Sequence, residues 1–456
     1  MCDLVTVIGG GIAGTEAAFQ LGARGIPVRL IEMRPETASP AHHTGSLAEL
    51  VCSNSLKSMD PNTAAGMLKS ELDELGSIVL AAARAHAVAA GGALAVDRDA
   101  FADALTRVVS ALPAVDVIRE RAGSIPDGDV IIATGPLTDP ALEPALRALA
   151  GDGRLAFFDA AAPIVDAEGI DRTVCFAQSR YDKGEGPDYL NCPMDESTYE
   201  RFVDALLAAD RVHAKDFESK DLFHACMPVE EIARRGRDAL RYGPMKPVGL
   251  TDPATGTRPH AVVQLRSENR ACTAYNLVGF QTNLTISEQR RVFGMIPGLA
   301  SATFLRLGVM HRNTFVDAPR LLGPDLTLRS EPRIRIAGQL SGSEGYLEAA
   351  ASGLVAALGV LRAASPALAP VRLPTETALG ALLAYASDPE TDPYQPMHVN
   401  FGLLPPLEPP VRGKRERAAA YAERGAAALG IWLLDASDLC IPDLSRRLPE
   451  LIAARE

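Results

Sequence analysis

The chain has 456 residues, of which 47% are hydrophobic and 22% charged, and its formal net charge is −12. This composition excludes a disordered chain, and the length predicts two or three domains with ample core. Seven cysteines without a Cys-x-x-Cys spacing argue against a disulfide framework, a zinc site and a dithiol reductase. We expect a cytoplasmic protein with no metal site and no signal peptide. We also expect no membrane segment, because Arg84 and His86 interrupt the most apolar stretch, 78–96.

The first 32 residues predict a strand–helix–strand unit. Residues 4–8 are a short apolar run suited to a buried parallel strand, 15–24 a helix, and 27–31 a second strand that ends at Glu32. The turn after the first strand matches Gly-x-Gly-x-x-Gly and consists of Gly9, Gly10, Gly11, Ile12, Ala13 and Gly14. With the acid at this spacing, the pattern predicts dinucleotide binding.

Each part of this unit has an expected role. Gly9 permits the tight turn, Gly11 lets the backbone approach a pyrophosphate, and Gly14 lets helix and strand pack closely. The helix N-terminus faces the phosphate charge. Glu32 is expected to accept hydrogen bonds from the adenosine ribose.

Two later segments favour FAD over NAD. After a helix that Asp97 caps, residues 129–135 form a strand ending in an Ala-Thr-Gly turn at Gly135. A further strand, 333–338, runs into a glycine-rich turn and an Ala-rich helix, as where such folds hold the ribityl chain and second phosphate. The expected contact residues there are Gly338, Gln339, Gly342, Gly345 and Tyr346. The alternatives are an ordinary turn with capping glycines and, for Tyr346, plain core filling.

Between these segments the dinucleotide signals stop. Strand-like runs occur at 261–265 and 275–280, and no second Gly-x-Gly-x-x-Gly marks a separate NAD(P) domain. The sequence therefore predicts an α/β chain with a Rossmann-like FAD-binding fold of the glutathione-reductase kind, in two pieces, 1–200 and 301–456. A smaller α+β domain is inserted at 201–300, and the catalytic cleft is expected between the two domains.

A lone cysteine in the predicted insertion precedes a cluster of cations. Cys226 is followed by Arg234, Arg235, Arg237, Arg241 and Lys246. Nearby cations lower the pKa of a thiol, and a thiolate is a strong nucleophile that can add to C6 of a pyrimidine and so make C5 nucleophilic. The alternative is a small buried hydrophobe beside a surface helix.

Local basic clusters stand out against the acidic total. Residues 264–313 hold six arginines against Glu268 and Glu288, and further clusters lie at 234–246 and 412–417. Such clusters bind a phosphate backbone with an affinity that falls as salt rises, or they are solvated helix faces. We expect the arginines of 264–313 to give RNA binding a steep salt dependence.

Six segments in order resemble the folate- and FAD-dependent tRNA (uracil-5-)-methyltransferases, the TrmFO family, which is related to the GidA-type wobble-uridine flavoproteins. They are 49–56, 226–250, 276–282, 308–314, 337–346 and 397–406. The Cys-Asn-Pro segment of a GidA-type protein is absent, and Val51-Cys52-Ser53-Asn54 stands in that region. His224 and Ala225 depart from the acid and glycine expected before the nucleophile.

The resemblance implies methylation of the T-loop uridine of tRNA, position 54, to 5-methyluridine. The carbon donor would be 5,10-methylenetetrahydrofolate, and FAD reduced by NADPH or NADH would supply electrons. Cys226 would be the nucleophile, and Cys52 a base, a partner thiol or a structural cysteine. The implied partner is the tRNA T-arm, which must present its uridine flipped out, and no protein partner is obligatory.

Three alternatives remain. A GidA-like flavoprotein would modify a wobble uridine together with a partner GTPase. A plain flavin oxidoreductase would bind neither RNA nor folate. A non-catalytic tRNA chaperone would tolerate Cys226→Ala.

Overall fold

The structure of the chain is a computed structural model. It describes residues 4–39, 41–150, 154–160, 162–182, 186–212, 227–269, 271–308, 310–392 and 394–439. Side chains are described for these residues except 150, 154–160, 182 and 310–313.

A five-stranded parallel sheet carries the N-terminal unit. Its strand order is β16-β7-β1-β2-β6, and every neighbouring pair is parallel. The strands are β1 (Val5–Ile8), β2 (Val28–Glu32), β6 (Val115–Arg119), β7 (Asp129–Ile132) and β16 (Ile334–Ile336). All four residues of β1 are buried, as expected for a strand covered on both faces.

Three long helices pack with this sheet: α1 (Ile12–Gly22), α4 (Arg98–Ser110) and α11 (Tyr346–Ala364). Helix α1 is buried along its whole length and packs against α11. The two backbones approach closely at Gly353 of α11, where a Cβ would lie 2.1 Å from the carbonyl oxygen of Ala13, and the absence of a side chain on glycine permits this contact. As predicted, Asp97 caps α4, its side chain accepting a hydrogen bond from the Ala100 N–H.

A second sheet of six strands has the order β10-β11-β12-β13-β9-β14, and every neighbouring pair is antiparallel. Its strands are β9 (Ile164–Asp166), β10 (Phe176–Ala177), β11 (Tyr189–Met194), β12 (Ala261–Ser267), β13 (Ala274–Leu277) and β14 (Phe304–Arg306). The helices around it are α6 (Glu196–Ala208), α7 (Val229–Arg234), α8 (Ala239–Tyr242) and α9 (Ile286–Phe293). The two predicted strands of the insertion correspond to β12 and β13.

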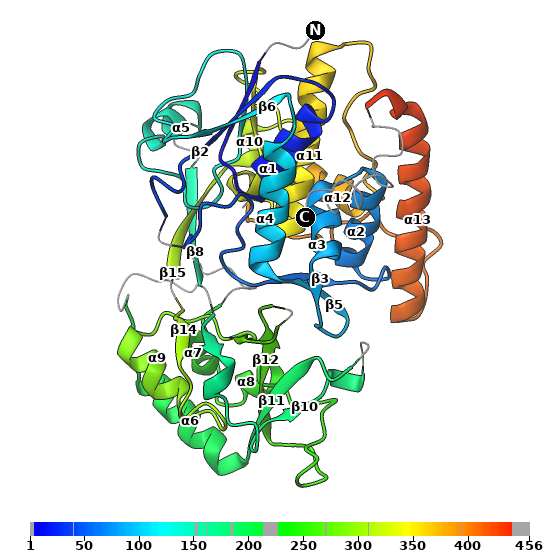
Figure 1. The fold of residues 1–456 in the computed structure, drawn as a ribbon. Coiled ribbons are helices and arrows are strands. Elements are labelled where there is room, and N and C mark those ends of the chain that lie inside the picture. Colours follow the sequence, from blue (N-terminus) through cyan, green and yellow to red (C-terminus); the bar gives the residue numbers. More distant parts are fainter. Residues whose placement is uncertain are drawn as a thin grey trace.

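A two-stranded ribbon, β8 (Arg154–Ala160) with β15 (Met310–Val316), runs between the two parts, the parallel sheet above and the second sheet below in Figure 1. Each part has its own buried hydrophobic core. The strands of the second sheet lie between Ile164 and Arg306, a wider interval than the predicted insertion 201–300. The domain division stays a prediction, and we propose outer limits for the insertion near 162 and 308.

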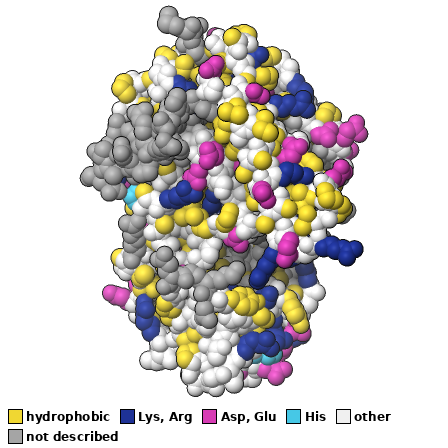
Figure 2. Space-filling model, turned by 90° about the vertical axis from the view of Figure 1, so that its right-hand side faces the viewer, with side chains coloured by type: hydrophobic (Ala, Val, Ile, Leu, Met, Phe, Trp, Pro, Cys, Tyr) yellow, Lys and Arg dark blue, Asp and Glu magenta, His cyan; other side chains and the backbone are white. Residues whose placement is uncertain are grey.

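The remaining elements surround the parallel sheet and the second sheet. They are β3 (Ser55–Ser58), β4 (Ala87–Val88), β5 (Ala93–Val96), α2 (Ala64–Glu74), α3 (Ile78–Ala85), α5 (Glu143–Ala150), α10 (Ala318–Leu321), α12 (Ala378–Ser387), α13 (Lys414–Asp435) and the 3-10 turns η1 (Ala167–Gly169), η2 (Arg180–Asp182), η4 (Gly338–Ser341) and η5 (Ser437–Leu439). The face that carries α13 mixes charges of both signs with hydrophobic side chains (Figure 2). Ile431 and Leu434 of α13 are exposed.

Among the described residues, α11 is the one helix that is long and apolar enough, by length and composition, to cross a membrane. Its most apolar window is 72% buried inside the protein. Its apolar side chains are therefore accounted for by the core that they form with α1.

Candidate functional site

A pocket with about 1040 Å³ of open space lies at the carboxyl ends of the parallel strands, beside the N-termini of α1 and α11. Ligands of open α/β sheets bind at this edge. Nine of the thirteen residues predicted to bind the cofactor line it: Gly9, Gly11, Ile12, Ala13, Glu32, Gly135, Gly338, Gln339 and Tyr346.

The glycine turn has the geometry that its spacing predicts. Gly9 has a φ of +103°, and a Cβ there would lie 2.5 Å from the carbonyl oxygen of Ala133. A Cβ on Gly14 would lie 1.8 Å from the carbonyl oxygen of Gly9, so only glycine lets α1 pack onto the turn. A Cβ on Gly11 would meet no heavy atom within 4 Å. The space over Gly11, at the start of α1, is where an anionic group can approach the backbone.

Glu32, at the end of β2, is 4% exposed and its carboxylate is held from two sides. The Gly10 N–H donates to Oε2 at 2.7 Å, and the Arg34 N–H and Nε donate to Oε1 at 3.0 and 2.8 Å. Burial alone would raise the pKa of Glu32, but the hydrogen bonds and charge of Arg34 outweigh it and hold the pKa below its usual value. The acid is therefore ionised and able to accept further hydrogen bonds from a ribose.

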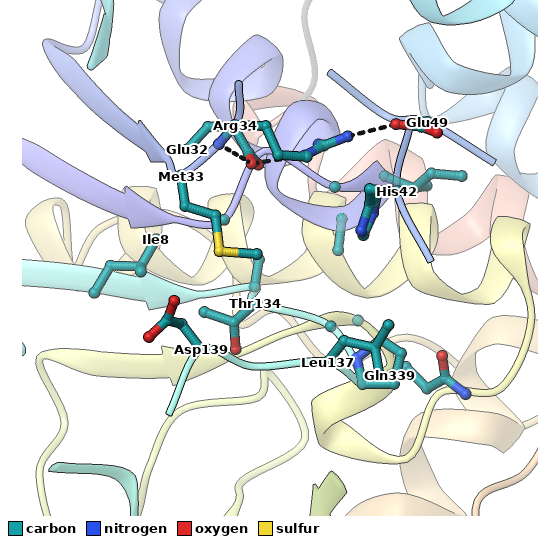
Figure 3. A pocket seen from close by; sticks show the side chains of 18 of the residues that line it. Ile8, Glu32, Met33, Arg34, His42, Glu49, Thr134, Leu137, Asp139 and Gln339 are labelled. Carbon is teal, nitrogen blue, oxygen red and sulfur yellow. Dashed lines mark hydrogen bonds and ion pairs between the residues drawn. The ribbon is translucent and has the colours of Figure 1, made fainter. Parts of the chain in front are cut away.

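Arg34 and Glu49 are pocket residues that the sequence reasoning missed. Arg34 is 1% exposed and its Nη1 donates to Glu49 Oε2 at 3.0 Å, so one guanidinium joins Glu32 to Glu49 (Figure 3). Glu49 also accepts from the backbone N–H groups of His43 and Thr44. A basic residue two positions after the ribose acid was the available signal.

His42 also lines the pocket. Its Nδ1 lies 2.5 Å from Ser39 Oγ. Burial and the charge of Arg34 lower the pKa of His42 to about 4. The imidazole is therefore neutral near pH 7.

The opposite wall comes from the turn after β7 and from η4. Thr134, Leu137, Asp139 and Gln339 lie there, across the pocket from the Glu32–Arg34–Glu49 row (Figure 3). The Gly338 N–H donates to Ser352 Oγ of α11 at 2.7 Å, which fixes the late glycine turn against the helix.

Gly342 and Gly345 do not line the pocket. A Cβ on Gly342 would lie 2.1 Å from Tyr394 Oη, and one on Gly345 would lie 2.2 Å from Glu348 Oε2. Both glycines have positive φ. In this structure they are needed for the shape of the turn, and their predicted contact with the cofactor stays untested.

Tyr346 joins the pocket to the segment that carries Cys52. Its hydroxyl oxygen accepts the N–H groups of Cys52 at 2.8 Å and of Ser53 at 3.2 Å. Burial and the neighbouring Cys52 raise the pKa of Tyr346, so the phenol is neutral. Tyr346 thus packs partly on the core, as the alternative supposed, and lines the pocket as well.

Cys226 lies outside the described residues, as do His224 and Ala225. The cations that follow Cys226 lie apart from the pocket. Arg237 pairs with Glu200 and Asp204, and Arg234 with Glu231. Arg241 and Lys246 line a separate surface pocket together with Arg258.

The arginines of 264–313 whose side chains the structure describes do not form one surface, and the side chains of Arg270 and Arg312 lie outside that description. Arg266 is only 5% exposed, and its Nε donates to Asn54 Oδ1 at 2.8 Å. Arg291 pairs with Glu288, and Arg306 donates to the carbonyl oxygen of Val51. Two of the six, Arg266 and Arg306, therefore bind the segment around Cys52.

Comparison with known proteins agrees with this geometry. A family model described as "Glucose inhibited division protein A" matches residues 4–366. A relative from Geobacter sulfurreducens is 54% identical over 437 residues, covering 95% of this chain and 99% of its own. One from Desulforudis audaxviator is 55% identical over 433 residues, covering 94% and 98%. Both are named methylenetetrahydrofolate–tRNA-(uracil-5-)-methyltransferase TrmFO.

Among solved structures, Aquifex aeolicus GidA in its form II crystal matches with a TM-score of 0.67 at 18% identity, covering 98% of this chain and 75% of that chain. The parallel sheet, the glycine turn and this likeness define a Rossmann-like FAD-binding fold of the GidA-related class. Within that class, the chain belongs to the TrmFO family.

Proposed function

We propose that this protein methylates C5 of the T-loop uridine at position 54 of tRNA, with 5,10-methylenetetrahydrofolate as carbon donor and FAD reduced by NADPH or NADH. The observation that carries the proposal is the 54% identity to a relative of that activity name over 95% of the chain. The wobble-uridine alternative has the family model over residues 4–366 and a likeness of fold at 18% identity, and neither carries the name of that activity.

The residues present fit FAD. The backbone at Gly11 is open, the start of α1 offers N–H groups to a pyrophosphate, and the ionised Glu32 lies at the end of β2 where a ribose is expected. When bound, reduced FAD supplies the hydride that converts a one-carbon unit at the formaldehyde level into a methyl group.

The chain itself supplies the thiols. Cys226 adds to C6 of the uracil, and the electron pair of the C5–C6 double bond moves to give an enolate whose C5 attacks the methylene carbon of the folate. A base takes the proton from C5 as the bond between the methylene carbon and the folate nitrogen breaks, which releases tetrahydrofolate and leaves an exocyclic methylene on C5. Hydride addition to that methylene expels the Cys226 thiolate and restores the C5–C6 double bond. We assign the role of base to Cys52, because its backbone N–H donates a hydrogen bond to the hydroxyl of Tyr346, which lines the pocket.

The surface pocket around Lys246 supports contact with the tRNA. Arg241, Lys246 and Arg258 line it, and Tyr242 beside them is 82% exposed. Cations beside an exposed aromatic ring suit phosphates and bases. We retain the cytoplasm as the location and no obligatory protein partner.

The test is transfer of radiolabel from methylenetetrahydrofolate to a tRNA transcript in the presence of NADPH. Cys226→Ala and Cys52→Ala are compared with Cys272→Ala, which removes an exposed cysteine away from the pocket. A transcript without the T-loop uridine is the substrate control. Wild type and Cys272→Ala should form 5-methyluridine, and Cys226→Ala should form none.

Three outcomes would contradict the proposal. Label at the wobble position would favour the GidA-like alternative. NADPH oxidation without any transfer to RNA would favour a small-molecule oxidoreductase. RNA binding that survives Cys226→Ala, without methylation by the wild type, would favour a chaperone.

A further inference from the structure

Side chains hold the backbone at Leu50 and Cys52, and strand β5 holds it at Asn54, whose carbonyl oxygen accepts the Val96 N–H at 3.0 Å. We call residues 49–54 the Cys52 loop. Arg98 Nη1 donates to the carbonyl oxygen of Leu50, and Nη2 donates to that of Cys52 at 3.1 Å. Tyr346 Oη accepts the Cys52 N–H and also the Ser53 N–H, which belongs to the same peptide as the Cys52 carbonyl. The backbone position of Cys52 therefore depends on where the guanidinium of Arg98 lies.

The position of Arg98 is set in turn from the second sheet. Arg98 is the first residue of α4, and its Nε and Nη2 bond the two carboxylate oxygens of Glu268, directly after β12. The side chains are 14% and 7% exposed. The guanidinium bonds both carboxylate oxygens and two carbonyl oxygens at once through its fixed fork of five N–H donors, whereas a lysine ammonium has only three donors.

A second link runs parallel to the first. Asn54 is fully buried, and its Nδ2 donates to the carbonyl oxygens of Val96 and Ser267, both at 3.0 Å. Its Oδ1 accepts from Arg266 Nε of β12. The Cys52 loop is thus held at the end of β12 at two points, by Glu268 through Arg98 and by Arg266 and Ser267 through Asn54. Strand β12 belongs to the second sheet, whereas the dinucleotide pocket lies at the parallel sheet.

We propose that Arg98 is a positioning residue which, through its ion pair with Glu268, transmits the placement of the second sheet to the backbone of Cys52. The inference rests on the proposed function, in which Cys52 takes part in the chemistry. It goes beyond that function because Arg98 does not line the dinucleotide pocket and acts through the carbonyl oxygens of Leu50 and Cys52.

The test uses Arg98→Lys, Glu268→Gln and the double variant in the FAD-loaded protein. Lysine keeps the charge and loses the fork, and glutamine keeps the shape and loses the charge. Arg84→Lys is the matched control, since Arg84 pairs with Asp73 at the surface with side chains 45% and 35% exposed. A displacement of about 1 Å costs on the order of 100-fold in rate, so we expect kcat for methylation to fall 10- to 100-fold in each single variant.

Three further results are expected with that fall. The KM for tRNA and the FAD content should stay near wild type, because Arg98 lines neither the dinucleotide pocket nor the surface pocket around Lys246. The double variant should lose no more than the worse single variant, since both remove one linkage. Alkylation of Cys52 by iodoacetamide, read by peptide mass spectrometry, should become about fivefold faster in Arg98→Lys as the loop loosens.

The alkylation rate is independent of methylation and separates the two proposals. If wild type does not methylate tRNA, the proposed function fails while alkylation still tests the linkage. An Arg98→Lys protein with wild-type kcat and wild-type alkylation overturns the positioning role. So does a variant that loses FAD and thermal stability in proportion to activity, because Arg98 would then be needed only for the fold.

Discussion

Gly11 and Gly14 differ by three positions in one turn, yet alanine should affect them in opposite ways. At Gly11 a methyl group meets no atom within 4 Å, and its φ of −70° suits alanine. We therefore expect Gly11→Ala to change the stability of the FAD-free protein by less than about 1 kcal/mol. At Gly14 the methyl group would lie 1.8 Å from the carbonyl oxygen of Gly9, so helix or turn must move. Overpacking of this kind costs about 3 kcal/mol.

Affinity for FAD should fall directly in Gly11→Ala, because the new methyl group lies where the cofactor binds. The methyl group on Gly11 occupies the space that a pyrophosphate needs, and it removes one or two hydrogen bonds from backbone N–H groups to a charged phosphate. At about 1.5–3 kcal/mol each, their loss amounts to about 3 kcal/mol, or roughly 100-fold in Kd.

The assay measures each variant twice, without FAD and with increasing FAD. The midpoint of thermal unfolding without FAD reports the packing of the turn, and quenching of FAD fluorescence reports the Kd. Gly11→Ala should unfold with the wild type when FAD is absent, and Gly14→Ala several degrees lower. Wild-type FAD affinity in Gly11→Ala would refute the assignment of the pyrophosphate to this turn. Equal stability of the two variants would refute the packing argument.

Three further predictions concern pH, the Cys52 loop and salt. Burial raises the pKa of Glu71, which accepts N–H groups at the start of α12, from 4.5 to about 7. Its contribution to folding is therefore complete below pH 4.5 and lost as pH rises through 7, up to about 3 kcal/mol, and Glu71→Gln should flatten the pH profile of urea unfolding. Tyr346→Phe leaves the Cys52 N–H without its acceptor, so the free energy of unfolding should fall by about 1–3 kcal/mol in urea titrations while FAD still binds. Lys246→Ala and Arg258→Ala should each reduce the slope of log K for tRNA against log salt by about 1, and an unchanged slope would place the RNA elsewhere.

The dinucleotide turn was predictable because its requirements are local. The positive φ of Gly9, the close approach at Gly14 and the acid at Glu32 all act within about 30 residues of chain, so spacing alone encodes them. The same holds for the cap at Asp97, where one side chain bonds an N–H three residues ahead. The fold class followed from these local signals.

Pairs between distant residues were not predictable. Arg34 bonds Glu49, 15 positions away, and Arg98 bonds Glu268, 170 positions away, and neither acid follows a pattern that indicates its partner. The second sheet was underestimated for a related reason. Its strands β9 and β10 have three and two residues, too few for periodicity to show, and β9 pairs with β13 and β14 far along the chain.

The destination of an arginine is the hardest property to infer from sequence, and it decides how RNA binding must be measured. Arg266 and Arg306 were counted among the basic residues expected to bind RNA, but both bond the Cys52 loop, and burial lowers the pKa of each guanidinium. Their replacement should therefore lower activity whether or not they contact RNA. Loss of activity in such a variant says nothing about phosphate contact, whereas a change in the salt slope does, because only a released counterion produces it. Arg266→Lys should accordingly lower kcat and leave the slope unchanged, and a slope reduced by about 1 would show that Arg266 reaches a phosphate after all.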